Sequence, residues 1–462
     1  MKNLQVYNPF DKTPVGEVKL SNEREVEKAL TLASDLHRRH RQGLPASLRI
    51  QVLRNTAEKM RVQRDELAML IAAEGGKPLI DAKVEVDRAI DGVETCASEI
   101  AANTGREIPM GLTPASEGKI AFTTREPIGP VVAVSAFNHP LNLIVHQVAP
   151  AVAAGCPVIV KPADDTPLSC RKFVEILAEA GLPNGWAQFI CCEIPLAEKL
   201  VTDPRVSFFS FIGSARVGWH LRSILAPGTR VALEHGGAAP VIVGKSADKK
   251  SLIPKMVKGG FYHSGQVCVS VQRIFALANN AQNVAEQISE LAKKLVVGNA
   301  THQETECGPL IRNREVERVS KWVDEAVAGG AKLICGGKKL SESCYHPTVL
   351  LNPPASALVS TQEIFGPVLC VYDSTDLNAA ISQANSLPFA FQAAVFSNDF
   401  DEIMTAYRGL DASAVMINEH TAFRVDWMPF AGRRQSGHGT GGIGYTIEEM
   451  TQSKMAVISL TN

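Results

Sequence analysis

Apolar residues recur at three- and four-residue intervals along the first hundred residues of the chain, which predicts amphipathic helices. The pattern covers residues 26–39, 48–73 and about 79–102, and the segment Gly75-Gly76-Lys77-Pro78 separates the last two. Residues 119–125 alternate between apolar and polar instead, with no helical pattern beside them. We therefore expect a helical N-terminal region followed by a strand in a hairpin arm.

From about residue 130, short apolar runs alternate with helical patterns, as in a chain of parallel strands joined by helices. The predicted strands are 131–134, 157–160, 187–190, 206–211 and 231–233, and the predicted helices are 140–154, 169–180, 196–201 and 216–225. This order implies a doubly wound parallel sheet. Right-handed crossovers would place the loops after its strands at one edge, where ligands usually bind.

A second alternation of strands and helices runs from residue 240 to about 417. Its predicted strands are 240–243, 273–277, 368–372, 393–396 and 414–417, and its predicted helices are 281–295, 315–328 and 377–384. Residues 455–460 predict one more strand near the C-terminus. The 462 residues therefore suit about three structural units of an α/β protein.

Composition narrows the class of protein. Lys plus Arg number 47 and Asp plus Glu 48, and this balance argues against a nucleic-acid binder. Ten cysteines without CxxC spacing predict neither a disulfide scaffold nor a metal site, but reduced thiols in the cytoplasm. The most apolar stretch, residues 141–160, contains Asn142, His146, Gln147 and two prolines, so we expect no membrane span. The N-terminus has no apolar core of a signal peptide.

Two reactive side chains stand at turns. Cys268 follows Gly265 and Gln266, and Glu234 follows the strand 231–233 and precedes two glycines. A thiol in a turn is a candidate nucleophile, and a carboxylate at the edge of a sheet is a candidate general base. Taken alone, each side chain also fits a plainer interpretation, a buried thiol or a solvated loop carboxylate.

Three further segments suit a nucleotide. Gly213-Ser214 lies between a predicted strand and a helix, where close backbone approach and the helix N-terminus favour a phosphate, although glycine there also serves turn geometry alone. Lys161 ends the strand 157–160 at the same sheet edge, and Glu363 and Phe365 precede the strand 368–372.

Together these residues resemble the aldehyde dehydrogenase superfamily over nearly the whole chain, from Asn8-Pro9 to the tail, most closely its lactaldehyde and semialdehyde branch. Five motifs stand in the order of that family: Phe137-Asn138-His139-Pro140, Lys161-Pro162, Gly213-Ser214 with Gly218, Leu233-Glu234-His235-Gly236-Gly237, and Gly265-Gln266-Val267-Cys268. Three residues beside the motifs depart from the family pattern: His235, Ala431 and Arg434. None of the three replaces a reacting group.

The resemblance implies an α/β fold with a Rossmann-like parallel-sheet cofactor domain, a second α/β catalytic domain and a small β oligomerisation arm. The implied boundaries are 1–107 and 127–235 for the cofactor domain, 236–435 for the catalytic domain, and 108–126 and 436–462 for the arm and tail. The arm implies a homodimer or homotetramer. The expected partners are a small-molecule aldehyde and further copies of the chain, with no nucleic acid and no membrane.

The resemblance also implies a mechanism. Cys268 would attack the aldehyde as a thiolate, while the Asn138 amide and the Cys268 backbone N–H hold the oxyanion. Hydride transfer to NAD or NADP would leave a thioester, which water activated by Glu234 would hydrolyse to the acid.

The implied cofactor is NAD, with NADP also used. The residues assigned to its binding are Ala136, Phe137, Lys161, Asp164, Gly213, Ser214, Val217, Gly218, His235, Glu363 and Phe365. The preference rests on Asp164, whose carboxylate would accept bonds from ribose hydroxyls and repel a 2′-phosphate. In the alternative interpretation, Asp164 and Asp165 cap the following helix.

Substrate contacts are assigned to His146, Val267 and Val269. His146 follows Asn138 by about two helical turns, which predicts that its imidazole faces the substrate tunnel, unless it bonds a neighbouring carbonyl. Arg424 would add positive charge near the pocket. A short polar aldehyde such as lactaldehyde, glyceraldehyde or succinic semialdehyde is therefore expected. Val267 stands where relatives that use doubly charged substrates carry Arg.

Three other functions are compatible with the same scaffold. A CoA-acylating relative would resolve the thioester with a thiol, but such relatives dispense with the carboxylate that Glu234 supplies here. Phosphonoacetaldehyde and glyceraldehyde-3-phosphate dehydrogenases are similar too. A non-catalytic structural protein on this scaffold would have lost Cys268, Glu234 or Asn138.

Overall fold

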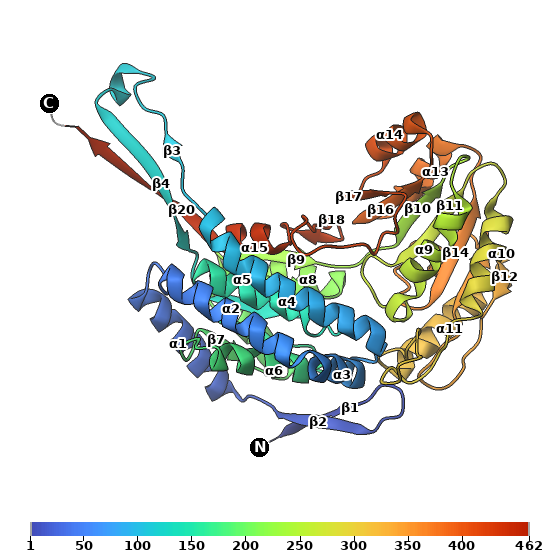
Figure 1. Ribbon diagram of the computed structural model, residues 1–462, viewed down its shortest axis with the longest axis horizontal. Helices are drawn as coiled ribbons and strands as arrows, with labels where there is room; N and C mark the ends of the chain where they lie inside the picture. The colour runs from blue at the N-terminus through green and yellow to red at the C-terminus, as the bar shows by residue number, and fades with distance from the viewer. Residues whose placement is uncertain (1, 461–462) are drawn as a thin grey trace.

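The structure is a computed structural model that describes residues 2–460. It contains two α/β units around two large sheets, and a long β arm that projects from the first unit (Figure 1). The helical N-terminal region and the alternations of strands and helices that the sequence predicts are all present.

The first sheet is the predicted doubly wound parallel sheet. Its strand order is β19-β9-β8-β5-β6-β7, and all neighbours are parallel except the short edge strand β19. The bounds are β5 (Val131–Val134), β6 (Val158–Lys161), β7 (Ala187–Phe189), β8 (Phe208–Ile212), β9 (Arg230–Glu234) and β19 (Gly437–His438). The chain order reverses between β5 and β8, so a crevice opens there at the carboxyl ends of the strands.

Helices cover both faces of this sheet because its strands are apolar on both sides. Val131 and Ala133 pack into one hydrophobic cluster, while Val132 between them packs into another on the opposite face. The first face carries α2 (Ala46–Val62), α3 (Arg64–Gly75), α4 (Leu79–Ala102), α5 (Asn142–Ala154), α6 (Pro167–Glu179) and α15 (Ile443–Glu449); the second carries α1 (Glu23–Arg39), α7 (Ile194–Thr202) and α8 (Ala215–Ser223). All 13 residues of α5 are buried, so this helix forms the centre of the first unit.

The prediction of one helix over residues 48–73 is wrong, because the chain turns at Gln63 between α2 and α3. The apolar spacing continues across the turn because both helices pack against α4. Two short antiparallel strands near the N-terminus, β1 (Asn3–Tyr7) and β2 (Pro14–Lys19), were not predicted.

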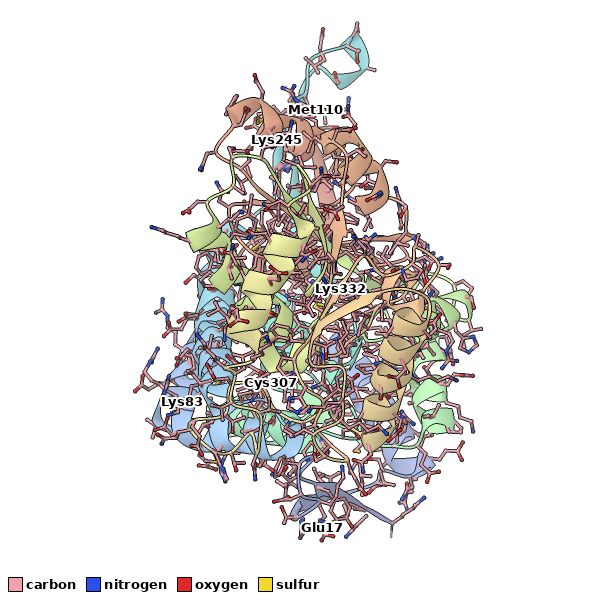
Figure 2. The ribbon with its side chains drawn as sticks, turned by 90° about the vertical axis from the view of Figure 1, so that its right-hand side faces the viewer. Glu17, Lys83, Met110, Lys245, Cys307 and Lys332 are labelled. Atoms are coloured by element: carbon pink, nitrogen blue, oxygen red, sulfur yellow. The ribbon has the colours of Figure 1, made fainter. Side chains whose placement is uncertain are left out.

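The second sheet has the order β12-β13-β14-β11-β10-β16-β17, and only the edge strand β12 runs antiparallel. Its strands are β10 (Ala239–Val243), β11 (Val271–Ala276), β12 (Lys332–Cys335), β13 (Thr348–Leu351), β14 (Val368–Asp373), β16 (Gln392–Phe396) and β17 (Ala414–Ile417). Its helices are α9 (Lys249–Phe261), α10 (Ala281–Ala292), α11 (Asn313–Ala328), α12 (Leu358–Thr361), α13 (Leu377–Ala384) and α14 (Phe400–Gly409). Figure 2 faces this unit and labels Lys332 on the edge strand. The sequence predicted neither β12 and β13 nor α9.

The arm is an antiparallel sheet of β3 (Glu107–Ile108), β4 (Lys119–Pro127) and β20 (Thr451–Ser459), which confirms the strands predicted at 119–125 and 455–460. Of the segment 436–462, which was assigned to the arm and tail, β20 joins the arm. β19 pairs with β9 of the first sheet, and α15 packs into the core of the first unit. Between residues 2 and 460, no helix has both the length and the apolar character to cross a membrane. Two short strands, β15 (Phe389–Ala390) and β18 (Arg433–Arg434), form a separate pair.

Candidate active site

A cavity of about 760 Å³ lies between the two α/β units. The first unit contributes the loops that follow β5, β6, β8 and β9, which are neighbours in the sheet and end at the same edge. The second unit contributes the loop before β11, the loop before β14 and the loop after β17. Residues distant in the sequence therefore meet in one space.

Most of the predicted site residues line this cavity. They are Ala136, Phe137, Asn138, Lys161, Asp164, Gly213, Ser214, Glu234, His235, Val267, Cys268, Val269, Glu363 and Phe365. His146, Val217 and Gly218 do not line it.

Cys268 stands apart from the other nine cysteines. All ten are unpaired, and Cys268 is the one that is not buried. Cys268 is partly exposed, but the cavity walls remove most of the water around its sulfur, and this desolvation raises the pKa of the thiol to about 12; the Arg424 guanidinium acts in the opposite direction. The side chain is therefore a thiol in this state of the enzyme, and it needs a base or a cation to become a thiolate.

The loop that carries Cys268 is anchored to the segment 309–311 through the Gln266 side chain. The Gln266 side-chain oxygen accepts a hydrogen bond from the Ile311 N–H at 2.9 Å. The Gln266 amide nitrogen donates to the Pro309 carbonyl at 3.2 Å. Gly265 has a φ of +70°, and a Cβ there would overlap the carbonyl of Gly366. Only glycine therefore fits at position 265 without moving the loop.

Asn138 reaches this loop from the first unit. Its side-chain amide donates to the Gln266 carbonyl at 2.9 Å. An asparagine amide has two N–H groups, and this is the one hydrogen bond that the Asn138 nitrogen makes within residues 2–460. The second N–H is thus available for an oxygen atom held beside Cys268.

Glu234, the last residue of β9, projects into the same cavity. A Cβ at Gly441 would overlap its carboxylate, so the glycine makes room for it. Burial raises the pKa of Glu234, and the nearby Arg424 charge opposes that rise. A raised carboxyl pKa brings this group closer to the range of a general base that works near neutral pH.

The cavity also suits a dinucleotide. Gly213 and Ser214 form the turn between β8 and α8, with Ser214 at the N-cap, so backbone N–H groups point outward there. The carboxylate of Glu363 lies where a Cβ on Gly236 would be, and its Oε1 atom is buried without a hydrogen-bond partner among the described residues. Burial raises the pKa of Glu363 to about 8. Ribose hydroxyls would supply the missing donors, so the residues present fit a nicotinamide dinucleotide.

The interpretation of Asp164 and Asp165 as helix caps is wrong. Asp164 accepts a hydrogen bond from the Lys161 ammonium at 2.7 Å, and Asp165 pairs with Arg312. The N-terminus of α6 is satisfied instead by the buried carboxylate of Glu74, which accepts the N–H groups of residues 168 and 169, both at 2.8 Å.

Two predicted cofactor residues are corrected. Val217 packs into the hydrophobic cluster below α8 instead of facing the cavity. Gly218 makes room for the ring of His235, because a Cβ at position 218 would overlap that imidazole. The Nδ1–H of His235 donates to the Gly213 carbonyl at 2.8 Å. Burial lowers the pKa of His235, so the ring stays neutral near pH 7. His235, one of the residues that depart from the family pattern, thus stabilises the turn at Gly213 and Ser214.

The prediction that His146 faces the substrate is also wrong. The ring is buried, and its Nε2 lies 2.7 Å from the Asp426 carboxylate. On its other side, Arg424 Nη2 lies 3.3 Å from His146 Nδ1. Arg424 lines the cavity and His146 does not, so the imidazole lies behind the guanidinium.

Several cavity residues were not predicted from the sequence. They are Arg88, Lys258, Tyr262, Arg312, Glu315, Arg318, Trp322 and Phe430. Three of them stand at three- and four-residue intervals on α11, namely Glu315, Arg318 and Trp322. Their shared face of a predicted helix could have indicated that this helix borders the cavity. The others lie on different elements and share no local motif.

The chain matches the aldehyde dehydrogenase family over residues 1–456. It is 36% identical to the 3-sulfolactaldehyde dehydrogenase of Priestia aryabhattai over 460 residues, which are 99% of this chain and 95% of that protein. The crystal structure of aldehyde dehydrogenase 21 from Physcomitrella patens in complex with the reaction product succinate has a TM-score of 0.96 at 32% identity, covering 99% of this chain and 95% of that one. Glyceraldehyde-3-phosphate dehydrogenase GapN from Methanocaldococcus jannaschii, complexed with NADP, has a TM-score of 0.94 at 32% identity and 99% coverage of both chains.

Proposed function

Because the chain belongs to the aldehyde dehydrogenase family, an NAD(P)-dependent oxidoreductase family, we propose that it oxidises a short polar aldehyde to its carboxylic acid through Cys268. One observation carries this proposal. The only cysteine that is not buried shares a single cavity with a carboxylate, a free amide N–H and the dinucleotide-binding turn. Relatives named for 3-sulfolactaldehyde and complexed with succinate support a short polar substrate.

In the first step, the Cys268 sulfur attacks the aldehyde carbon, and its proton passes to a base in the cavity. The developing oxyanion is held by the second amide N–H of Asn138 and the backbone N–H of Cys268, which together stabilise the tetrahedral thiohemiacetal. Asn138 is pre-oriented for this by its bond to the Gln266 carbonyl.

NAD(P), when bound, would supply the hydride acceptor for the thiohemiacetal carbon, and an acyl thioester would then remain on Cys268. Ser214 and neighbouring amides would hold the pyrophosphate, and Glu363 would accept hydrogen bonds from the nicotinamide ribose. Glu234 then takes a proton from a water molecule, which attacks the thioester and releases the acid and the Cys268 thiol. Lys161 and Asp164 would contact the adenosine ribose.

The domain division and the assembly belong to the same proposal. The first sheet with its helices forms the cofactor domain, and the second sheet forms the catalytic domain. The arm leaves Phe122, Met455 and Val457 exposed, which supports a homodimer or homotetramer in which these side chains are covered. Ten unpaired cysteines support a reducing compartment such as the cytoplasm.

The test of this function is a panel of aldehydes with purified enzyme, NAD and NADP. We expect reduced cofactor and one equivalent of carboxylic acid for each short polar aldehyde oxidised, with kcat/KM above that for hexanal or benzaldehyde. The measurement is the absorbance of the reduced cofactor together with chromatographic identification of the acid. Oxidation of hexanal in preference to every short polar aldehyde would overturn the substrate class, and no oxidation of any aldehyde would overturn the function.

Cofactor choice gives a second expected result. NAD should be preferred over NADP, and Asp164→Ser should raise the NADP/NAD ratio of kcat/KM by roughly tenfold, or about 1.4 kcal/mol. The substitution removes a charge that repels a 2′-phosphate, and it frees the Lys161 ammonium that Asp164 now holds. Asp165→Ser is the matched control, since its carboxylate pairs with Arg312 instead of Lys161. A wild-type enzyme that clearly favours NADP, or an unchanged ratio in Asp164→Ser, would contradict this role of Asp164.

A further inference from the structure

A buried ion pair lies behind the turn that presents Asn138, and the proposed mechanism does not use it. Lys77 and Glu85 are both fully buried, and their side chains form a salt bridge. Lys77 precedes α4, and Glu85 stands on that helix. Neither residue lines the cavity. Because burying two charges costs free energy, the pair needs further contacts that compensate this cost.

Glu85 is bonded to the start of α5. Its Oε1 atom accepts the N–H groups of Leu141 and Asn142, at 2.9 and 3.0 Å. The first N–H groups of a helix have no partner inside the helix, and a negative charge is favourable beside them. These two residues follow Asn138 by three and four positions. The carboxylate therefore fixes the end of the turn that carries the Asn138 amide.

Lys77 is bonded to the same turn at a second point. Its ammonium nitrogen lies 2.8 Å from Nδ1 of His139, the residue directly after Asn138. Because an ammonium group only donates, Nδ1 carries the lone pair that accepts this bond. Burial, with the Lys77 charge beside the ring, lowers the pKa of His139 to about 4, so the imidazole is neutral near pH 7. The ion pair thus holds the turn at residues 139, 141 and 142.

The two charges of the pair depend on each other. Burial acts to raise the pKa of Glu85, but the Lys77 ammonium outweighs it and holds that pKa well below the usual range. Burial lowers the pKa of Lys77, and the Glu85 carboxylate opposes that change. Removal of one partner would leave the other charge buried without compensation.

From these contacts we propose that Lys77 and Glu85 are positioning residues for the oxyanion hole. They hold the turn 138–142 so that the free N–H of Asn138 points at the aldehyde oxygen beside Cys268. An oxyanion donor is effective only when it is fixed at hydrogen-bond distance from the place where the charge develops. This inference rests on the proposed function, because it requires that Asn138 binds the oxyanion.

The test is a double-mutant cycle between Glu85 and Asn138, measured with succinic semialdehyde and NAD. Glu85→Gln keeps the shape of the side chain and removes its charge. In the wild-type background, kcat/KM for the aldehyde should fall by roughly 10- to 100-fold, mainly through kcat. In the Asn138→Ala background the donor is already absent, so the same substitution should cost less than about threefold. The Kd of NAD, measured by protein fluorescence, should stay within about twofold of wild type.

Glu74→Gln is the matched control. Glu74 is also a buried carboxylate that accepts two N–H groups at the start of a helix, but those groups belong to residues 168 and 169 of α6. It makes no hydrogen bond to the turn 138–142 among the described residues. Any loss of kcat/KM that Glu74→Gln causes should therefore be the same factor in the wild-type and Asn138→Ala backgrounds.

Hydrogen–deuterium exchange reports on the turn without any turnover. The peptide that contains residues 138–142 should exchange roughly tenfold faster or more in Glu85→Gln, because the N–H groups of Leu141 and Asn142 lose a charged acceptor. Glu74→Gln should leave this peptide unchanged and speed exchange at residues 168–169 instead.

A second variant covers the case in which Glu85→Gln does not fold. Lys77→Met/Glu85→Gln removes both charges together, so that neither is left buried without a partner. It should show the same dependence on Asn138 and the same faster exchange of residues 138–142. Circular dichroism and the Tm of each variant report whether it is folded.

Each outcome bears on the inference. Equal losses for Glu85→Gln in the two backgrounds, a loss confined to NAD binding, or unchanged exchange of residues 138–142 would overturn it while aldehyde oxidation stands. If Asn138→Ala keeps the activity of wild type, the oxyanion role of Asn138 fails and the inference fails with it. A wild type that oxidises no aldehyde overturns the proposed function itself.

Discussion

Replacement of Cys268 by Ser should reduce aldehyde oxidation by roughly 10³-fold or more, the largest loss expected from any single substitution in this protein. A serine hydroxyl releases its proton far less readily than a thiol, and burial in this cavity already raises the pKa of the Cys268 thiol to about 12. The oxygen analogue would also leave an ester in place of a thioester after hydride transfer. Steady-state formation of reduced cofactor and of acid measures the effect.

Cys335→Ser is the matched control for this substitution. Cys335 is buried on the edge strand β12 and does not line the cavity. The same exchange of sulfur for oxygen there should leave kcat within about twofold of wild type. Substantial oxidation by Cys268→Ser, with a folded protein and unchanged cofactor binding, would show that another group attacks the aldehyde.

Replacement of Glu234 by Gln should separate the two halves of the reaction. The first turnover, up to hydride transfer, should proceed and give a burst approaching one equivalent of reduced cofactor per active site. Turnover after the burst should slow by roughly 10²- to 10³-fold, because an amide cannot take the proton of the attacking water. Gln has the shape of Glu, so the space that Gly441 leaves for this side chain remains filled. Stopped-flow absorbance followed by steady-state rates would measure both phases.

An added nucleophile distinguishes a blocked hydrolysis from general damage to the site. Hydroxylamine attacks thioesters directly and should restore turnover in Glu234→Gln. Coenzyme A offers a thiol instead, and restoration by coenzyme A in preference to hydroxylamine would favour the CoA-acylating alternative. Absence of a burst, or full steady-state activity, would refute the role assigned to Glu234.

The cofactor side of the site was the part that the sequence predicted best. Buried parallel strands appear as short apolar runs, and their loops must end at one edge of the sheet. The strand pattern placed positions 161, 213 and 234 at this edge, the resemblance to the family added 136–138 and 164, and all of them line the cavity. Gly218 was misassigned because a glycine near a helix start suits either a phosphate or a neighbouring side chain. Here the neighbour is the ring of His235.

The substrate side was harder to predict, because helical spacing shows which residues share a face of a helix but not what packs against that face. The spacing of eight residues was interpreted as if Asn138 and His146 shared one helix, but α5 begins only at Asn142, and the ring of His146 is held by Asp426, 280 positions later in the chain. Arg424 belongs to no local sequence motif, so the direction of its side chain depended on the path of the loop after β17.

The order of the two α/β units followed from the sequence pattern, and the resemblance to the family added Cys268 and Glu234 as the proposed nucleophile and base. These features are encoded in short motifs and in the periodicity of apolar residues, which act over a few residues at a time. Which charges remain without a salt bridge depended instead on how the two units pack together. Arg88 and Asp426 are 338 positions apart, and their contact leaves Arg424 without a salt bridge beside Cys268, where the Glu234 carboxylate is the main opposite charge that acts on it. Ion pairing depends on distance in space, and that distance is fixed only once both units have packed around the cavity.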